Sequence, residues 1–367
     1  MQFGYTFDKI SERIGKNIAN PSNEFIRYLL KRRTRIMIKI ALVGYGYWGI
    51  NVARNLYKNK NYDFSVICDK RRERLDLANT VYANALTYEL NYDKIIQDAT
   101  ITAVALAVET SEHYSLAKQA LLAGKHVYVE KPFTDNVQSA QELFELAQEK
   151  DLRIHVDHIM VYHPVIRKIK EIIDNGDLGE LMYFDCSRIN LGNIKNDVNS
   201  MWDLSVHDLS IIDYLSDGME PVNVTAMGQK AYSVKESIVF LTLKYEKFLA
   251  NVTSSWLSPI KERRLIIAGS KKMLVYDDVD VLNKLIVYDK GFDVEEGLSD
   301  LEYDEFVTKT RIGDALIPQL ESGDALFNSL EHFRLCMIDG KESLTDAKSA
   351  IRMLKILEKA DKIMNSN

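Results

Sequence analysis

The alternation of apolar strands with amphipathic helices between residues 38 and 156 is the feature that most constrains the fold. Short apolar runs predict strands, and the stretches between them repeat their apolar residues at helical spacing. A chain that alternates in this way builds a parallel sheet with helices on its faces. The predicted strands are 38–43, 64–68, 103–108, 126–129 and 154–156, and the predicted helices are 50–57, 71–82, 112–123 and 138–150.

A glycine-rich turn joins the first strand to the first helix. Gly44 to Gly49 has the pattern Gly-x-Gly-x-x-Gly, and Asp69 follows Gly49 by 20 positions, at the end of the second strand. In this context the pattern predicts a dinucleotide-binding Rossmann fold with the phosphates at the helix N-terminus. The expected cofactor contacts in this part of the chain are Gly44, Tyr45, Gly46, Tyr47, Trp48, Gly49, Asp69 and Lys70.

The acidic residue also bears on the choice of cofactor. A carboxylate at Asp69 accepts hydrogen bonds from the adenosine ribose and repels a 2′-phosphate, which favours NAD. The adjacent cations Lys70, Arg71 and Arg72 would accept such a phosphate, so NADP is the less favoured alternative.

The pattern changes after about residue 160. A helix at 164–174 is followed by strand-like runs with short turns, which predict a largely antiparallel sheet with one face covered and one open. An open sheet face is a natural subunit interface, so we expect a homo-oligomer, either a dimer or a tetramer. The predicted strands are 181–189, 222–226, 238–245, 248–256, 264–268, 273–276 and 281–288, and the closing helices are 324–338 and 345–364.

We therefore expect an α/β chain of three parts. Residues 1–36 form an extension, 37–157 a Rossmann NAD-binding domain, and 158–367 an α+β domain with an open, mostly antiparallel sheet for substrate binding and oligomerisation. The last helix is expected to pack back on the Rossmann domain.

The extension carries eight Lys and Arg against three acids. A packing arm on a partner subunit, or a dispensable segment before a start at Met37, is favoured over a membrane-surface helix.

Composition excludes several classes of protein. With 46% hydrophobic and 27% charged residues, the chain has the balance of a soluble globular protein. A net charge of −6 argues against a nucleic-acid-binding surface. No apolar run approaches the ~20 residues of a membrane span, and no secretory signal is visible. The three cysteines, Cys68, Cys186 and Cys336, lie far apart and fit buried thiols in a reducing cytoplasm.

Two short motifs carry the predicted chemistry. Glu130-Lys131-Pro132 closes the strand 126–129, at the sheet edge where open α/β sheets bind ligands. Asp203 and His207 lie four apart on a predicted helix that runs to residue 215, so they share one helical face. A carboxylate beside an imidazole is the arrangement that prepares a general base. Taken singly, the first motif also fits a solvated loop, and the second a helix cap near an unrelated histidine.

Together with the glycine-rich turn, these motifs resemble the oxidoreductase family named for glucose–fructose oxidoreductase, inositol dehydrogenase and the rhizopine catabolism protein MocA. The resemblance spans roughly residues 37 to 365. It implies a nucleotide-binding domain joined to an open-sheet domain, and NAD(P)-dependent oxidation of a sugar CH–OH group. It also implies that His207 takes the hydroxyl proton, that Lys131 donates to the developing oxyanion or shares the acid–base role, and that Asp203 orients both. Glu130 and Lys131 would contact the cofactor, with Glu130 near the nicotinamide ribose.

One departure narrows the substrate. Ser205 and Ser210 stand where many members have glycine and a second aspartate, whereas Trp202-Asp203-Leu204 with His207-Asp208 is similar to a subgroup that acts on nucleotide-linked sugars. This subgroup implies hydride transfer at C3 of a UDP-N-acetylhexosamine or its uronate, in the synthesis of surface polysaccharide or lipopolysaccharide sugars. The alternatives are an inositol or free-sugar dehydrogenase, an NAD-dependent glycoside hydrolase of the same superfamily, or a nucleotide sensor without chemistry.

Further substrate contacts are expected at Tyr162, His163, Arg167 and Asn190, with His207. A neighbouring cluster of His155, Asp157, His158 and His163 lacks metal-ligand spacing, so no metal is expected.

Overall fold

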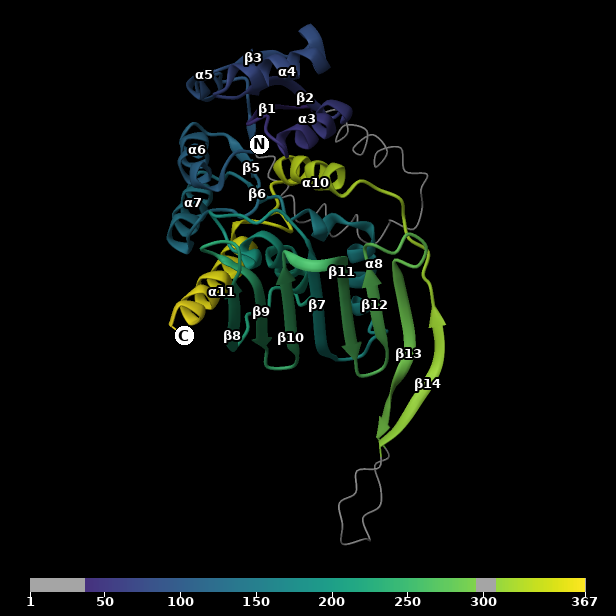
Figure 1. Cartoon of the computed structure of the whole chain (residues 1–367). Helices are drawn as coiled ribbons and strands as arrows, with labels where there is room; N and C mark the ends of the chain where they lie inside the picture. Colours follow the sequence, from purple (N-terminus) through teal and green to yellow (C-terminus); the bar gives the residue numbers. More distant parts are fainter. Residues whose placement is uncertain (1–36, 295–307, 367) are drawn as a thin grey trace, which may run out of the picture.

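This computed structural model describes residues 37–294 and 308–366, so the predicted N-terminal extension lies outside the described residues. The chain builds two sheets, with helices between and around them (Figure 1). No helix in the described ranges is both long and apolar enough to cross a membrane.

The first sheet is parallel and has the strand order β3-β2-β1-β4-β5-β6, the order of a Rossmann fold. This confirms the predicted parallel sheet. Its strands are β1 (Ile38–Val43), β2 (Tyr62–Cys68), β3 (Thr87–Glu89), β4 (Ala103–Leu106), β5 (His126–Val129) and β6 (Ile154–Val156). Its helices are α3 (Gly49–Lys58), α4 (Arg72–Tyr82), α5 (Tyr92–Gln97), α6 (Thr110–Leu122) and α7 (Val137–Glu149).

The second sheet has eight strands in the order β14-β13-β12-β11-β7-β10-β9-β8. Only the β10–β7 pair is parallel among its paired strands, which confirms the mostly antiparallel expectation. The strands are β7 (Leu181–Leu191), β8 (Asn223–Lys230), β9 (Glu236–Lys244), β10 (Leu249–Ser255), β11 (Leu257–Gly269), β12 (Met273–Asp277), β13 (Leu285–Val294) and β14 (Thr308–Leu316).

The two faces of this sheet differ in burial. Leu241 and Val252 are fully buried on the inner face, whereas Met227 and Phe240, paired across β8 and β9, are 73% and 52% exposed on the outer face. The larger hydrophobic cluster includes residues of both sheets, such as Val129 and Leu241, so the two halves share one core. The helices of this part are α8 (Pro164–Asp174), α9 (Val206–Leu215), α10 (Ala325–Asp339) and α11 (Ala347–Ser366).

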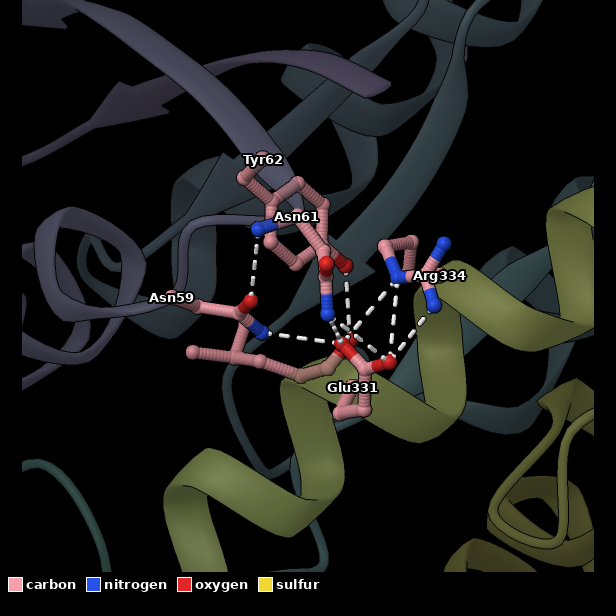
Figure 2. A network of polar contacts seen from close by, with 6 residues as sticks. Asn59, Asn61, Tyr62, Glu331 and Arg334 are labelled. Carbon is pink, nitrogen blue, oxygen red and sulfur yellow. Dashed lines mark hydrogen bonds and ion pairs between the residues drawn. The ribbon is translucent and has the colours of Figure 1, made fainter. Parts of the chain in front are cut away.

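The last two helices return to the first sheet. α11 packs against α7, and α10 packs against α3. Figure 2 shows the polar contacts at the start of β2, where Asn59 Nδ2 donates to Glu331 Oε2 at 2.9 Å and Arg334 Nη2 donates to Glu331 Oε1 at 2.6 Å. The Tyr62 hydroxyl donates to the Leu330 carbonyl at 2.6 Å. These bonds fix α10 against the nucleotide-binding half.

One local prediction is wrong. The predicted helix that contains Asp203 and His207 is divided into a π-helical turn, η3 (Met201–Ser205), and the α-helix α9. A π turn holds more residues than an α turn, so the four-residue spacing does not stack Asp203 directly over His207.

Candidate active site

The glycine-rich turn fits a bound pyrophosphate. Gly44 has a φ of 92°, and a Cβ on Gly49 would lie 2.1 Å from the Gly44 carbonyl oxygen, so the helix start approaches the strand too closely for a side chain. A Cβ on Gly46 would meet nothing nearer than Arg71 Nη2 at 3.9 Å. The backbone at Gly46 is therefore open to a ligand at the N-terminus of α3.

Asp69 is held by the same turn. Its Oδ2 accepts a hydrogen bond from the Tyr45 backbone N–H at 2.8 Å, and its Oδ1 accepts from the Arg71 backbone N–H at 2.9 Å and from Arg71 Nε at 3.3 Å. Burial raises the pKa of Asp69, but these hydrogen bonds outweigh it and hold the pKa below its ordinary value. The carboxylate is therefore ionised beside the place where an adenosine ribose would lie.

The other residues of this region point in different directions. The Tyr45 ring is buried and packs edge-on against Tyr82, so only its backbone faces the turn. Tyr47 is 90% exposed, and the Lys70 side chain is exposed with its ammonium 4.0 Å from Glu109.

Lys131 lies between the end of β5 and the turn η3. It follows β5, and its Nζ donates to the Asp203 carbonyl oxygen at 3.0 Å and lies 3.8 Å from Asp203 Oδ1. Asp203 Oδ1 also accepts from Lys195 Nζ at 2.7 Å, and its Oδ2 accepts from Trp256 Nε1 at 3.2 Å. The sequence analysis gave no role to Lys195, which lies on an irregular segment between β7 and η3 where no pattern marks it.

Burial and charge set the protonation of this group. Burial lowers the pKa of Lys131, and the Asp203 carboxylate opposes that effect only in part. Burial raises the pKa of Asp203, but the positive charges of Lys131 and Lys195 bring it below its ordinary value. The ion pair is intact at neutral pH, with a lysine that gives up its proton more readily than an exposed one.

His207 lies near Lys131 and is not bonded to Asp203 by any hydrogen bond that the structure describes. Its Nδ1 is buried and has no hydrogen-bond partner among the described residues. Burial, followed by the charge of Lys131, lowers the pKa of His207 well below its ordinary value, so the imidazole is neutral and able to accept a proton. Near His207, Arg188 and Asp208 form a buried bidentate ion pair with N–O distances of 3.0 and 2.7 Å.

Glu130 forms a second buried pair with Asp157, next to Lys131. Burial and the negative charge of Asp157 raise the pKa of Glu130 well above its ordinary value, so Glu130 is the protonated member of the pair. Asp157 Oδ2 accepts from Trp48 Nε1 at 3.2 Å, which links the cofactor turn to the lysine motif. Glu130 Oε2 accepts from the Lys131 backbone N–H at 3.1 Å, and the protonated Glu130 shares a side-chain hydrogen bond with Asp157. The ribose contact expected of Glu130 stays a prediction.

The predicted substrate residues are divided between two places. Asn190 Oδ1 accepts from Arg263 Nη2 at 2.5 Å, and the charge of Arg263 acts on His207. His163 caps α8, with its Nε2 3.9 Å from Asp278 Oδ1. Tyr162 and Arg167 instead line a cavity of 1110 Å³ between α8 and α10 that does not include the lysine motif. The Tyr162 hydroxyl is bonded to Ser343 and Thr345, and Arg167 donates to the Tyr214 hydroxyl.

A second cavity, of 590 Å³, adjoins the lysine motif. Pro132 and Trp202 line it, together with Glu109 at the start of α6. Asp361 of α11 accepts from Asn199 Nδ2 at 2.9 Å and Trp202 Nε1 at 2.7 Å, so the C-terminal helix holds the segment that carries Asp203. This volume lies within the range of small-molecule sites. Sequence reasoning missed Asp361 because the contact joins residues 159 positions apart.

The fold and the site together define an NAD-binding oxidoreductase. Comparison with known proteins agrees: residues 38–158 match the family described as oxidoreductase family, NAD-binding Rossmann fold, and residues 166–275 match the GFO/IDH/MocA C-terminal domain. The chain belongs to the GFO/IDH/MocA oxidoreductase family, as its resemblance implied, and it is an NAD-binding oxidoreductase.

Two proteins with sequences similar to this chain are a dehydrogenase of named substrate and an uncharacterized oxidoreductase. A UDP-N-acetylglucosamine 3-dehydrogenase from Acidithiobacillus ferrooxidans is 30% identical over 246 residues, which is 66% of this chain and 74% of that protein. The uncharacterized oxidoreductase YhhX of Escherichia coli is 24% identical over 88% of this chain and 96% of its own.

Solved structures support the fold. A structure of the Acidithiobacillus ferrooxidans enzyme, GnnA, has a TM-score of 0.75 at 22% identity and covers 90% of this chain and 99% of its own. GenD2 from gentamicin A biosynthesis, in complex with NAD, has a TM-score of 0.73 at 17% identity and covers 90% of this chain and 94% of its own.

Proposed function

We propose that the protein transfers hydride between NAD and C3 of a UDP-N-acetylhexosamine or its uronate, in the cytoplasmic synthesis of surface polysaccharide or lipopolysaccharide sugars. The observation that carries this proposal is the convergence of Lys131, Asp203 and the neutral His207, next to Pro132 and Trp202, which line a cavity. The 30% identity to a UDP-N-acetylglucosamine 3-dehydrogenase supports the substrate class.

Each side chain has a proposed part in the chemistry. Oxidation of an alcohol removes a hydride from carbon and a proton from oxygen, and leaves a carbonyl. NAD, when bound, supplies the hydride acceptor. His207 takes the hydroxyl proton, because its imidazole is neutral. The Lys131 ammonium donates a hydrogen bond to the oxygen as its negative charge develops. Asp203 holds that ammonium in place, and Glu130 faces the nicotinamide ribose.

The cavity beside Pro132 supports a substrate larger than a free polyol. Lys230 and Lys235 are among its lining residues and are the proposed contacts of a diphosphate, although Lys230 Nζ also lies 3.5 Å from Glu236 Oε1. Asp135 and Glu236 line the same cavity and offer acceptors to sugar or ribose hydroxyls.

We also propose that the enzyme is a homo-oligomer joined through the outer face of the second sheet. The strand pairing brings Met227 and Phe240 side by side there, both largely exposed. Large exposed apolar side chains gathered on one sheet face are typical of an interface.

The test is a substrate panel with purified protein and NAD. UDP-N-acetylglucosamine, its uronate, a dTDP-sugar, free inositol and a chromogenic glycoside are assayed separately for NADH absorbance and for glycoside release. We expect NADH only with a UDP-sugar. NADH formation with inositol alone would contradict the proposal, and glycoside release without net NADH would indicate the hydrolase alternative.

Matched variants test the assignment of residues. Lys131→Met and His207→Asn should each lower kcat/KM by about 10²–10⁴-fold while NADH still binds. Lys125→Met is the control, because Lys125 is a buried lysine whose ammonium donates to the Asp98 and Ile101 carbonyls. It should lose stability and keep its turnover. Full activity in either site variant would refute its catalytic role.

A further inference from the structure

His158 differs from the other buried histidines that surround the site. It is 1% exposed, and neither its Nδ1 nor its Nε2 has a hydrogen-bond partner among the described residues. An imidazole removed from water with both nitrogens unpaired is costly, so a native structure keeps one only where something else pairs with it.

His155, three residues earlier, shows the structural alternative. It is also fully buried, but its Nε2 lies 2.8 Å from Ser329 Oγ and its Nδ1 lies 2.9 Å from Ser343 Oγ. Its ring stacks on Tyr128 with the centroids 4.9 Å apart. Both polar atoms of His155 are therefore satisfied within the fold, and those of His158 are not.

The strand pairing of the first sheet puts His158 next to the end of β5, where Glu130, Lys131 and Pro132 follow. Val156 of β6 pairs with Val129 of β5, and the Asp157 N–H donates to the Val129 carbonyl at 2.8 Å, so residues 157–158 lie beside the lysine motif. The backbone of His158 is fixed on both sides, by a bond to the Val156 carbonyl and one from the Val161 N–H.

Asp157 and His158 are adjacent in the chain but interact with different parts of the site. Asp157 bonds Trp48 of the cofactor turn. His158 lies within electrostatic reach of Lys131 and of His207, and the turn that follows it, η2 (Ile159–Tyr162), packs against α9. Burial lowers the pKa of His158 to about 3, so the ring is neutral and offers one donor and one acceptor.

We propose that His158 is a substrate-binding residue, one of whose ring nitrogens hydrogen-bonds a hydroxyl of the sugar next to the reacting carbon. Two further buried polar atoms lack a hydrogen-bond partner among the described residues, namely Ser205 Oγ and His207 Nδ1, and His207 lies within electrostatic reach of His158. A ligand rich in hydroxyl groups would pair with such a set, whereas an apolar ligand would leave it unpaired. This inference rests on the proposed oxidation of a sugar.

The test compares His158→Phe with His155→Phe, and includes His158→Gln, which keeps a donor and an acceptor. Phenylalanine at position 158 removes unpaired polar atoms, so the Tm should stay unchanged or rise by about 2–4 °C. Phenylalanine at position 155 breaks two hydrogen bonds and should lower the Tm by at least about 2 °C.

For catalysis we expect the opposite ranking of the two variants, with the larger loss in His158→Phe. With UDP-N-acetylglucosamine and NAD, His158→Phe should lower kcat/KM by about tenfold or more, mainly through KM. NADH affinity, followed by fluorescence, should be unchanged, and His158→Gln should recover part of the loss. A Tm loss in His158→Phe as large as that in His155→Phe, or undiminished kcat/KM, would overturn the inference. Wild-type protein that oxidises inositol but no UDP-sugar would contradict the proposed substrate alone, and the variants would then be compared on inositol.

Discussion

At the scale of single residues, burial decides the charge of the groups to which we assign the proton transfer. His207 is neutral because it is buried beside the positive charge of Lys131, and the Asp203 carboxylate favours the charged form of Lys131. Short motifs in the sequence single out Lys131, Asp203 and His207, and their catalytic roles stay a prediction. Lys195, Trp256 and Asp361 join the site through long-range packing, which no local pattern encodes.

This charge state predicts a pH profile. His207 accepts a proton only when it is neutral, and its pKa lies well below the ordinary value of about 6.5. The kcat/KM for NADH formation should therefore stay constant as the pH falls from 8 to about 6.5 and decline only at lower pH. On the alkaline side, the lowered pKa of Lys131 should bring a decline before its ordinary value of about 10.4. An acid limb centred at or above about 6.5 would contradict the assignment of His207.

Asp69 predicts the cofactor preference. Asp69→Ser removes the ionised carboxylate beside the ribose site and leaves Arg71 free of its ion pair. We expect the ratio of kcat/KM with NADP to kcat/KM with NAD to rise by about tenfold or more, since a hydrogen bond to a charged group contributes about 1.5–3 kcal/mol. Asp63→Ser is the control, because Asp63 is an exposed carboxylate at the opposite end of β2 from Asp69. An unchanged ratio in Asp69→Ser would show that the carboxylate does not select the cofactor.

At the scale of elements, strands with strong apolar patterns were predicted well, and elements fixed by tertiary contacts were not. β1, β5 and β6 have the predicted bounds. β3 and α5 were missed because both are short and polar, and β14 was missed because only its pairing with β13 makes it a strand. The π turn η3 carries Trp202, which donates a hydrogen bond to Asp361 of α11, and no spacing rule anticipates this long-range contact.

The return of α10 to the first sheet makes a prediction about stability. Glu331 accepts hydrogen bonds from Asn59, Asn61 and Arg334, and the Arg334 side chain is 1% exposed. Glu331→Ala should lower the free energy of unfolding by about 1.5–3 kcal/mol, measured by urea denaturation. Glu145→Ala, on the exposed face of α7, should change it by less than about 0.5 kcal/mol. Equal effects at the two positions would show that the network of Figure 2 contributes little.

At the scale of the whole molecule, the second sheet has a buried inner face that supports the site and an outer face with no covering element in the described part of the chain. The α/β class and the two kinds of sheet were predictable because strand–helix alternation and short-turn strands differ plainly in sequence. The division at residues 157 and 158 stays a prediction, since one hydrophobic cluster runs through both halves.

The outer face predicts an oligomer that one charge should disrupt. Phe240→Asp places a carboxylate at the centre of the exposed strand pair β8–β9 and should convert the oligomer to a monomer in light-scattering measurements. Leu77→Asp is the matched control, because Leu77 is 42% exposed on α4, away from the second sheet. A monomeric wild-type protein, or a Phe240→Asp variant of unchanged mass, would contradict the proposed interface.

Isotope transfer tests the central claim most directly. UDP-N-acetylglucosamine carrying deuterium at C3 is incubated with the enzyme and NAD, and the reduced cofactor is isolated for mass spectrometry. Transfer of the C3 hydride predicts one deuterium in each molecule of reduced cofactor. Reduced cofactor without deuterium would contradict the account, because the hydride would then come from another position.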